Sequence, residues 1–299
     1  MNYSLLDKIV SADGGFLATI LKTEGHTYRK AGARALFYDG DPIPVHGNLG
    51  SLCADQEIVD AGRAACRAAR PRVVRIDTTG DDDADLGYGT FCGGVMEVLI
   101  EPVAKAHRSV YSDVRARLER GEVCHLVHDL VTGDLAVTDE AAPGAERYVE
   151  AVTPPWRVVL FGATPLARRL AAILDDSEFD VHITDWRSAF LERCEHLDAR
   201  CRHLDSFPVA RGAFAVIVSH SYRRDQEALR AALDADCAFV GLLSSRPRRE
   251  RMFAELAAAG VAPAALARVS SPVGLDLGSR DDAEIAVAIA AEVIRAVRR

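Results

Sequence analysis

The chain has 299 residues, of which 49% are hydrophobic and 27% charged, a balance typical of folded proteins and a length sufficient for two domains. Its formal net charge of −8 argues against nucleic acid as a partner, because neutralising phosphates requires a predominantly basic surface. The amino-terminal apolar stretch carries Asp7 and Asp13, and no uninterrupted run of about 18 apolar residues occurs, so we expect neither a signal peptide nor a membrane span. These features predict a soluble, cytoplasmic protein.

The cysteines argue against both a disulfide framework and a zinc site. Their number is odd and no Cys-x-x-Cys pair occurs among them. Reduced thiols in the cytosol fit this pattern better. They stand at positions 53, 66, 92, 124, 194, 201 and 237.

The first half of the chain predicts a mixed α+β domain. Two strand candidates, Gly15–Lys22 and Ala33–Tyr38, flank a polar turn, which indicates a hairpin-like sheet edge. A helical pattern over Gln56–Arg70 ends at Pro71. Further strands are expected at 72–77 and 95–100, a helix at 106–120 and a hairpin at 122–137. Pro154 and Pro155 mark a boundary, giving domains of residues 1–153 and 154–299.

The second half alternates short apolar runs with segments of helix length. This alternation predicts an α/β domain with a doubly wound parallel sheet of the Rossmann type. The expected strands are 158–161, 181–184, 215–219 and 238–243. Ser279 to Asp282 is interpreted as a capping box for a last helix, whose apolar positions recur every four residues from Ile285 to Val297.

The turn Gly162–Ala163–Thr164–Pro165 follows the first of these strands and leads into a helix. In a dinucleotide fold such a glycine lets the backbone approach a pyrophosphate, and an acid after the second strand binds ribose hydroxyls. Asp185 stands where that acid belongs, with Arg187 beside it. Thr164, however, replaces the second glycine and Pro165 removes one N–H donor. Two interpretations stay open: a retained nucleotide or pterin-phosphate site, and a purely structural Rossmann unit.

Ser219 and His220 end the third strand, at the edge where open α/β sheets bind ligands. His220 can act there as an acid, a base or an anion donor, or it can simply pack near Asp225. Arginines at positions 246, 248, 249 and 251 fall in the first turns of the next helix. Cations oppose the helix dipole there unless an anion such as phosphate sits with them, and a solvated basic face is the alternative.

The densest glycine cluster, residues 87–97, presents Cys92 on a turn before a strand. Glycines let a chain wrap around a ligand, and a loop thiolate can bind a soft metal or carry sulfur. A plain glycine turn with a half-buried thiol is the alternative. Cys53 stands in a similar segment, residues 47–55. Together the two cysteines suggest a pair of thiols facing one pocket.

These motifs, in this order, resemble the XdhC/CoxI family of accessory factors for molybdenum hydroxylases. The resemblance rests on residues 23–34, 47–55, 89–94, 97, 101–102, 161–163, 185–187, 219–220, 239–243 and 272–278, and so covers nearly the whole chain. Two departures fall in expected ligand loops. Ser51 and Leu52 replace the glycine pair before Cys53, and Thr164 replaces the last residue of a Gly-Ala-Gly turn.

The resemblance implies a chaperone that binds the molybdenum cofactor, molybdopterin, and delivers it to an apo-hydroxylase such as xanthine dehydrogenase. A cysteine desulfurase is then the source of the sulfur that replaces a terminal oxygen. Carried over by position, Cys53 and Cys92 would be metal ligands and catalytic thiols, with His220 as a further catalytic residue. The cofactor-binding residues would be Gly162, Ala163, Thr164, Pro165, Asp185, Arg187, Ser219, His220 and Arg246.

Two other functions stay open at this stage. In an NAD(P)-dependent oxidoreductase, Asp185 would bind the adenosine ribose, and His220 or a loop cysteine would act on a small substrate. A non-catalytic scaffold would only dock the hydroxylase. We also expect a homodimer, because a small domain with exposed glycine loops often needs covering.

Overall fold

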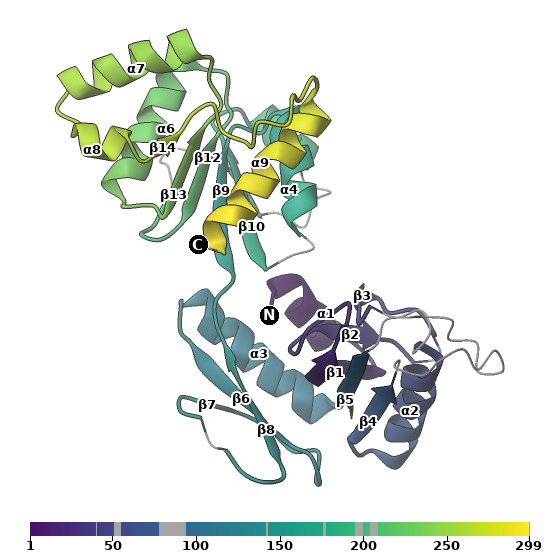
Figure 1. Cartoon of the computed structure of the whole chain (residues 1–299). Coiled ribbons are helices and arrows are strands. Elements are labelled where there is room, and N and C mark those ends of the chain that lie inside the picture. Colours follow the sequence, from purple (N-terminus) through teal and green to yellow (C-terminus); the bar gives the residue numbers. More distant parts are fainter. Residues whose placement is uncertain are drawn as a thin grey trace. The chain divides into compact units, whose positions relative to one another are not determined.

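The structure is a computed structural model that describes residues 1–39, 41–50, 55–77, 94–141, 143–175, 178–194, 200–203 and 209–298. The chain divides into two compact units, residues 3–154 and 155–299 (Figure 1). Each unit has its own β-structure and two hydrophobic cores. Among the helices within the described ranges, none has the length and apolar character needed to span a membrane.

The larger sheet of the first unit is antiparallel, with the strand order β3-β2-β1-β5-β4. Its strands are β1 (Phe16–Gly25), β2 (Arg34–Phe37), β3 (His46–Gly47), β4 (Arg72–Asp77) and β5 (Gly94–Pro102). The hairpin-like pair expected near the start of the chain is confirmed as β1 and β2. Phe16 and Phe37 face each other across these strands, with ring centroids 4.7 Å apart.

The two faces of this sheet pack against different layers. Helix α2 (Asp55–Ala68) covers one face. An added Cβ at Gly62 of α2 would lie 2.3 Å from the Phe16 ring, so the close approach of helix and sheet requires glycine there. The other face packs against α1 (Tyr3–Ser11), α3 (Lys105–Glu119) and a second, three-stranded sheet.

The second sheet has the strand order β7-β6-β8, formed by β6 (Cys124–Asp129), β7 (Leu135–Thr138) and β8 (Arg147–Val152). The helices expected at 56–70 and 106–120 and the hairpin at 122–137 are confirmed. Helix α1, strand β8 and the short strand β3 were not predicted. Only the last residue of β8 is fully buried, so its sequence has no clear two-residue alternation.

The second unit contains a parallel sheet with the strand order β11-β10-β9-β12-β13-β14, which confirms the doubly wound α/β prediction. Its strands are β9 (Trp156–Phe161), β10 (Phe179–Asp185), β11 (Arg200–His203), β12 (Phe214–Ile217), β13 (Phe239–Leu242) and β14 (Val269–Ser270). The four inner strands match the predicted apolar runs. The edge strands β11 and β14 were not predicted, because they are short and polar or half-buried.

Helices cover both faces of the parallel sheet (Figure 1). One face carries α4 (Pro165–Asp175) and α9 (Asp282–Val297), and the other carries α6 (Tyr222–Asp234), α7 (Arg246–Ala258) and α8 (Pro263–Leu266). The short helix α5 (Ser188–Leu191) and the 3-10 turn η1 (Glu192–Cys194) follow β10.

The start of α9 corrects one prediction. The capping residue is Asp281, not Ser279: its carboxylate accepts the N–H groups of Ala283 and Glu284 at 2.8 and 2.9 Å. Glu284 in turn accepts the N–H of Arg280 at 2.5 Å. Asp281 therefore satisfies two free N–H groups of the first turn, which a serine two positions earlier does not reach, and Glu284 satisfies the N–H of the residue before the cap.

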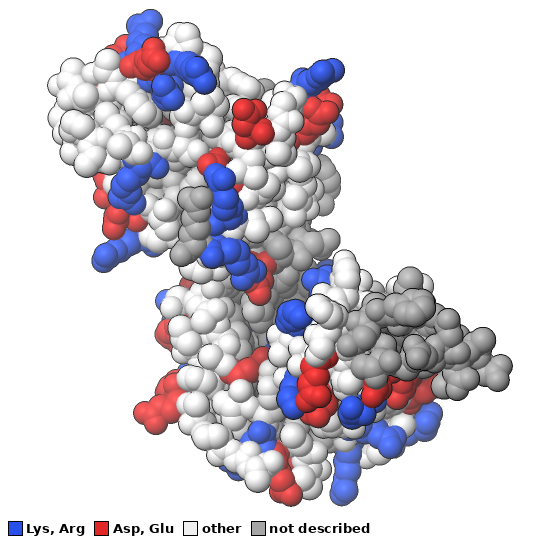
Figure 2. All heavy atoms as spheres, in the orientation of Figure 1, with Lys and Arg blue, Asp and Glu red and all other residues white. Residues whose placement is uncertain are grey.

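Charged side chains are mixed over the face drawn in Figure 2. Lys and Arg side chains lie in small groups beside Asp and Glu, and neither sign forms one continuous field on this face. Exposed ion pairs of the chain include Arg63 with Asp60 and Arg251 with Glu255. Each exposed pair contributes little to stability.

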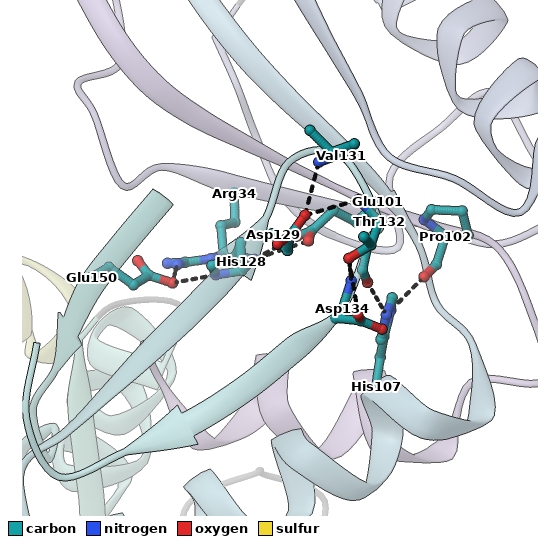
Figure 3. Close-up of polar contacts among 11 residues, drawn as sticks. Arg34, Glu101, Pro102, His107, His128, Asp129, Val131, Thr132, Asp134 and Glu150 are labelled. Atoms are coloured by element: carbon teal, nitrogen blue, oxygen red, sulfur yellow. Dashed lines mark hydrogen bonds and ion pairs between the residues drawn. The ribbon is translucent and has the colours of Figure 1, made fainter. Parts of the chain in front are cut away.

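A buried polar network joins the two sheets of the first unit (Figure 3). His128 of β6 is fully buried, and its Nδ1 lies 2.9 Å from both carboxylate oxygens of Glu101 in β5. Its Nε2 lies 3.4 Å from Oε1 of Glu150 in β8. Arg34 of β2 forms an ion pair with the same Glu150. Four strands from two sheets thus meet in one cluster of alternating charge.

The network sets the protonation of its members. Burial alone would lower the pKa of His128, but the hydrogen bonds to Glu101 and Glu150 outweigh it and raise the pKa to about 9. Burial would raise the pKa of Glu150, but the charge of Arg34 and the bond from His128 lower it to about 2. His128 is therefore an imidazolium and Glu150 a carboxylate at neutral pH.

We expect the first unit to lose stability as the pH rises. His128 has a pKa of about 9 in the folded chain against an ordinary 6.5, so its contribution is complete below pH 6.5 and is lost as the pH rises through 9. The loss should be on the order of 3 kcal/mol. Urea unfolding from about pH 6 to about pH 10 measures it.

Glu101→Gln is the matched variant, because it keeps an acceptor beside His128 but removes its charge. Its stability should fall at lower pH than that of the wild type. A nuclear magnetic resonance titration that finds His128 changing protonation near its ordinary pKa would contradict the prediction.

Candidate functional site

The site predicted on the second unit lies where the carboxyl ends of β10, β9 and β12 stand side by side. From β9 the chain runs outward through β10 to β11, and it then returns to β12 on the other side of β9. Ligands of open α/β sheets bind at such a switch point, outside the carboxyl ends of the strands. Gly162, Asp185 and Ser219 follow or end these three strands, so the structure brings them together at this edge.

Gly162 allows the ends of β9 and β12 to touch. Its φ is +108°, and an added Cβ would lie 2.4 Å from Cα of Ser219. The N–H of Gly162 donates to the carbonyl of Thr184 at 2.7 Å, which also fixes the turn to β10. Packing between three strand ends therefore explains this glycine without a ligand.

Thr164 immediately precedes helix α4. Its side chain is 2% exposed, and its Oγ1 accepts the N–H of Ala167 at 3.2 Å. Pro165 follows as the first helical residue, where a missing N–H costs nothing. The residue that interrupts the glycine pattern is thus a helix cap.

Asp185 is fully buried and already holds four protein donors. Its carboxylate accepts the N–H of Ala163 at 2.7 Å, the N–H of Arg187 at 2.8 Å, and the Arg187 guanidinium at 2.8 and 2.7 Å. Burial would raise the pKa of Asp185, but the bonds from Arg187 and Ala163 lower it. A ribose diol would have to displace one of these donors, and contact between Asp185 and a nucleotide stays a prediction.

A second buried carboxylate lies beyond β12. Asp225 in α6 is 1% exposed and accepts hydrogen bonds from Ser219 Oγ and, at 2.6 Å, from Arg248 in α7. Burial raises the pKa of Asp225, and Ser219 and Arg248 oppose that rise. The Nε of Arg248 is buried and has no partner within the described part of the chain, although the whole side chain is 28% exposed.

His220 stands beside this carboxylate in a strained conformation. Its φ is +64°, in the left-handed region that residues other than glycine rarely adopt. Its side chain is exposed, and its proximity is a minor influence that opposes the rise in the pKa of Asp225. The structure thus presents an imidazole at the carboxyl edge, while its role as acid, base or anion donor stays a prediction.

The arginines of α7 have separate partners. Arg249 donates to the carbonyl of Ser271 at 2.8 Å, and Arg251 pairs with Glu255 at 3.0 Å. Arg246 is exposed at the first position of the helix. Arg246 and Arg248 remain as the arginines of this helix best placed for an anion.

An aromatic and cationic cluster at the same edge was not predicted from the sequence. The Arg187 guanidinium lies near the rings of both Trp186 and Phe190, and the Arg224 guanidinium also lies near the Trp186 ring. The only signal in the sequence was the run Asp-Trp-Arg after an apolar strand, which gives no indication that Arg224 is near.

Cys53 and Cys92 lie outside the described residues, so their predicted roles stay predictions. The described thiols are less suited to that chemistry: burial raises the pKa of Cys66, of Cys124 and, to about 11, of Cys237. Cys194 is fully buried. Over the ranges that the structure describes, no group of three or more His, Cys, Asp or Glu residues could hold a metal ion.

Comparison with protein families finds two matches that together cover more than half of the chain. Residues 158–293 match the XdhC Rossmann domain, and residues 11–77 match the XdhC and CoxI family. The chain belongs to the XdhC and CoxI family. Its second unit is the family's Rossmann domain, from β9 to near the end of α9.

Three relatives are similar to this chain over nearly its whole length. A Bacillus subtilis protein, named as a probable subunit of xanthine dehydrogenase, is 27% identical over 99% of this chain and 98% of its own length. An uncharacterised Escherichia coli protein, YqeB, is 23% identical over 93% of the chain, which spans only 43% of that protein. A Bacillus halodurans crystal structure, described as a xanthine dehydrogenase, is 26% identical, with a TM-score of 0.79 over 99% of this chain and 95% of the other.

Substituting Gly162 tests whether packing alone requires that glycine. Gly162→Ala should lower stability by about 3 kcal/mol, because two costs add: the Ser219 backbone must shift, and alanine must adopt a strained positive φ. Gly260→Ala is the control: its φ is +91° but nothing lies within 4 Å of an added Cβ, so only the φ penalty of about 1 kcal/mol applies. Equal losses in urea unfolding would contradict this steric explanation.

Asp185→Asn tests whether this carboxylate is a structural clamp. The neutral amide accepts fewer bonds, so the turn after β9 should lose on the order of 2 kcal/mol without any ligand present. Asp276→Asn, at an exposed position of the same unit, should change the unfolding midpoint little. A variant with unchanged stability but weaker nucleotide binding would instead make Asp185 a ligand contact.

Proposed function

We propose that this chain is an accessory factor that binds the molybdenum cofactor and delivers it to a hydroxylase of the xanthine dehydrogenase type. The observation that carries the proposal is family membership over both units, with an end-to-end match to a relative named as a probable subunit of xanthine dehydrogenase. A cysteine desulfurase as sulfur donor and a homodimeric assembly are further parts of the proposal.

The carboxyl edge of the parallel sheet fits the phosphate end of that cofactor. Arg248 has a buried Nε–H without an acceptor within the described ranges, which an anion would satisfy. Arg246 and His220 are exposed at the same edge and add donors. In the proposed complex these three side chains supply part of the positive charge around the phosphate, and Ser219 and Asp225 hold Arg248 in place.

Cys53 and Cys92, which lie outside the described residues, are proposed as the thiols that handle the molybdenum of the cofactor. When bound, the cofactor supplies a molybdenum centre with an exchangeable terminal ligand. The raised pKa values of Cys66, Cys124 and Cys237 support the choice, because thiols that stay protonated are poor metal ligands and poor nucleophiles.

An NAD(P)-dependent oxidoreductase is the second candidate. The Rossmann match and the place of Asp185 after β10 favour it. Against it, Asp185 takes the Ala163 N–H that would otherwise face a pyrophosphate, and Thr164 caps the helix where a second glycine would stand. Delivery of the molybdenum cofactor is therefore the better supported function.

The decisive experiment measures activation of an apo-hydroxylase co-expressed with the chain. The wild type should raise both hydroxylase activity and its molybdenum content, and Cys92→Ala should return both to the level found without the chain. Cys66→Ala, a substitution of a half-buried helical thiol, should activate normally. All three proteins should unfold at similar temperatures, because replacing a single cysteine by alanine removes only the sulfur atom.

Full hydroxylase activity without the chain would overturn the proposed function. Normal activation by Cys92→Ala would overturn the role proposed for Cys92. Bound NAD(P) in place of molybdenum and pterin, found in the protein purified from its own host, would establish the second candidate.

A further inference from the structure

A contact between Trp186 and Arg224 spans the switch point of the parallel sheet. Trp186 follows β10, and Arg224 lies in the first turn of α6, which follows β12. Strand β9 stands between these two strands. The Arg224 guanidinium nevertheless lies 5.6 Å from the centroid of the Trp186 ring. The pair therefore reaches across the end of β9, where the Gly162 turn begins.

Arg187 supports the Trp186 ring from its own side. The guanidinium lies 4.4 Å from the centroid of Trp186 and 3.8 Å from that of Phe190. Asp185 fixes its Nε and one terminal nitrogen. The other terminal nitrogen has no acceptor in the part of the chain that the structure describes. Trp186 thus contacts two arginines, one held rigidly by Asp185 and one on a separate helix.

The second arginine belongs to a group with excess positive charge. Glu227 accepts from both Arg223 at 3.0 Å and Arg224 at 2.9 Å, so a single carboxylate serves two cations. The Arg224 side chain is 45% exposed and the Arg187 side chain 32% exposed. Trp186 is itself only half-buried. A planar ring and two cations are therefore open to a ligand at this edge.

Surface cation and ring contacts of this kind need no function, since each contributes only weakly to stability. The position of these contacts in the fold, however, favours a role in ligand binding. An indole face binds planar rings by stacking, and guanidinium groups bind phosphate oxygens through paired hydrogen bonds. Both lie where a doubly wound sheet receives its ligand.

We propose that Trp186, Arg187 and Arg224 recognise the planar heteroaromatic, phosphate-bearing part of the ligand. The ring stacks on Trp186 in place of the Arg224 guanidinium, and Arg224 turns to the phosphate together with the remaining N–H groups of Arg187. The inference rests on the proposed function for the choice of site. A pterin phosphate and an adenine nucleotide share this chemistry, and binding experiments separate them.

Tryptophan fluorescence tests the contact directly, because the chain has two tryptophans. Trp156 begins β9, at the opposite end of the strand, and packs against Phe214 with centroids 5.8 Å apart. Trp156→Phe leaves Trp186 as the single emitter, and Trp186→Phe leaves Trp156. Each variant is titrated with a pterin monophosphate, with AMP and with inorganic phosphate.

Saturable quenching by a heteroaromatic probe is expected in Trp156→Phe and not in Trp186→Phe. Quenching by the pterin phosphate identifies a pterin site, and quenching by AMP a nucleotide site. Arg224→Gln should weaken binding about tenfold, the loss expected for one charge-assisted contact. Arg230→Gln is its control, because Arg230 lies in the same helix, is 52% exposed and pairs with Asp234.

The inference would be overturned if neither the pterin monophosphate nor AMP quenched the fluorescence of Trp186. It would also be overturned if inorganic phosphate quenched this fluorescence as strongly as the heteroaromatic probes do. An equal effect of Arg224→Gln and Arg230→Gln would also overturn it. Activation of the hydroxylase is measured separately. If the chain activates the hydroxylase but its fluorescence is not quenched, this inference is wrong and the proposed function still stands.

Discussion

The carboxylate of Asp185 holds the carboxyl edge of the parallel sheet together. It joins the Ala163 N–H of one strand end to Arg187 of the next. The turn fixed in this way brings Gly162 against Ser219, where only a glycine fits. Ser219 then orients Asp225, which positions Arg248. The order of the whole edge thus depends on one buried charge, which the bidentate partner and backbone donors keep ionised.

The sequence predicted the parallel sheet well, because its inner strands are continuous apolar runs separated by helices. It also predicted that Gly162, Asp185 and Ser219 would share one edge. It could not distinguish a ribose-binding acid from one that binds Arg187, since both require the same residue after the same strand. The contact between Gly162 and Ser219 joins positions far apart in the chain, and no local pattern encodes it.

In the first unit, contacts between residues far apart in the chain were even harder to predict from the sequence. Helices α2 and α3 and the hairpin of β6 and β7 follow local periodicity and were predicted, whereas helix α1 and the half-buried β8 were not. Glu101, His128 and Glu150 come from three strands, and their spacing in the chain carries no signal that they meet. Glu101 stood out only through family resemblance. The network ties two sheets together, so a motif residue there has a structural role that needs no ligand.

The pairing of charges at the carboxyl edge of the parallel sheet bears on the proposed delivery of a cofactor. The carboxylates of Asp185 and Asp225 are already paired with Arg187 and Arg248 without a ligand, although the buried Nε–H of Arg248 lacks an acceptor in the described part of the chain. A ligand that uses Arg187, Arg224 or Arg248 must compete with these carboxylates, which lowers its net binding free energy. An enzyme that retains its cofactor gains nothing from such competition. A carrier of the kind proposed here benefits from it, because a cofactor that is to be delivered has to dissociate.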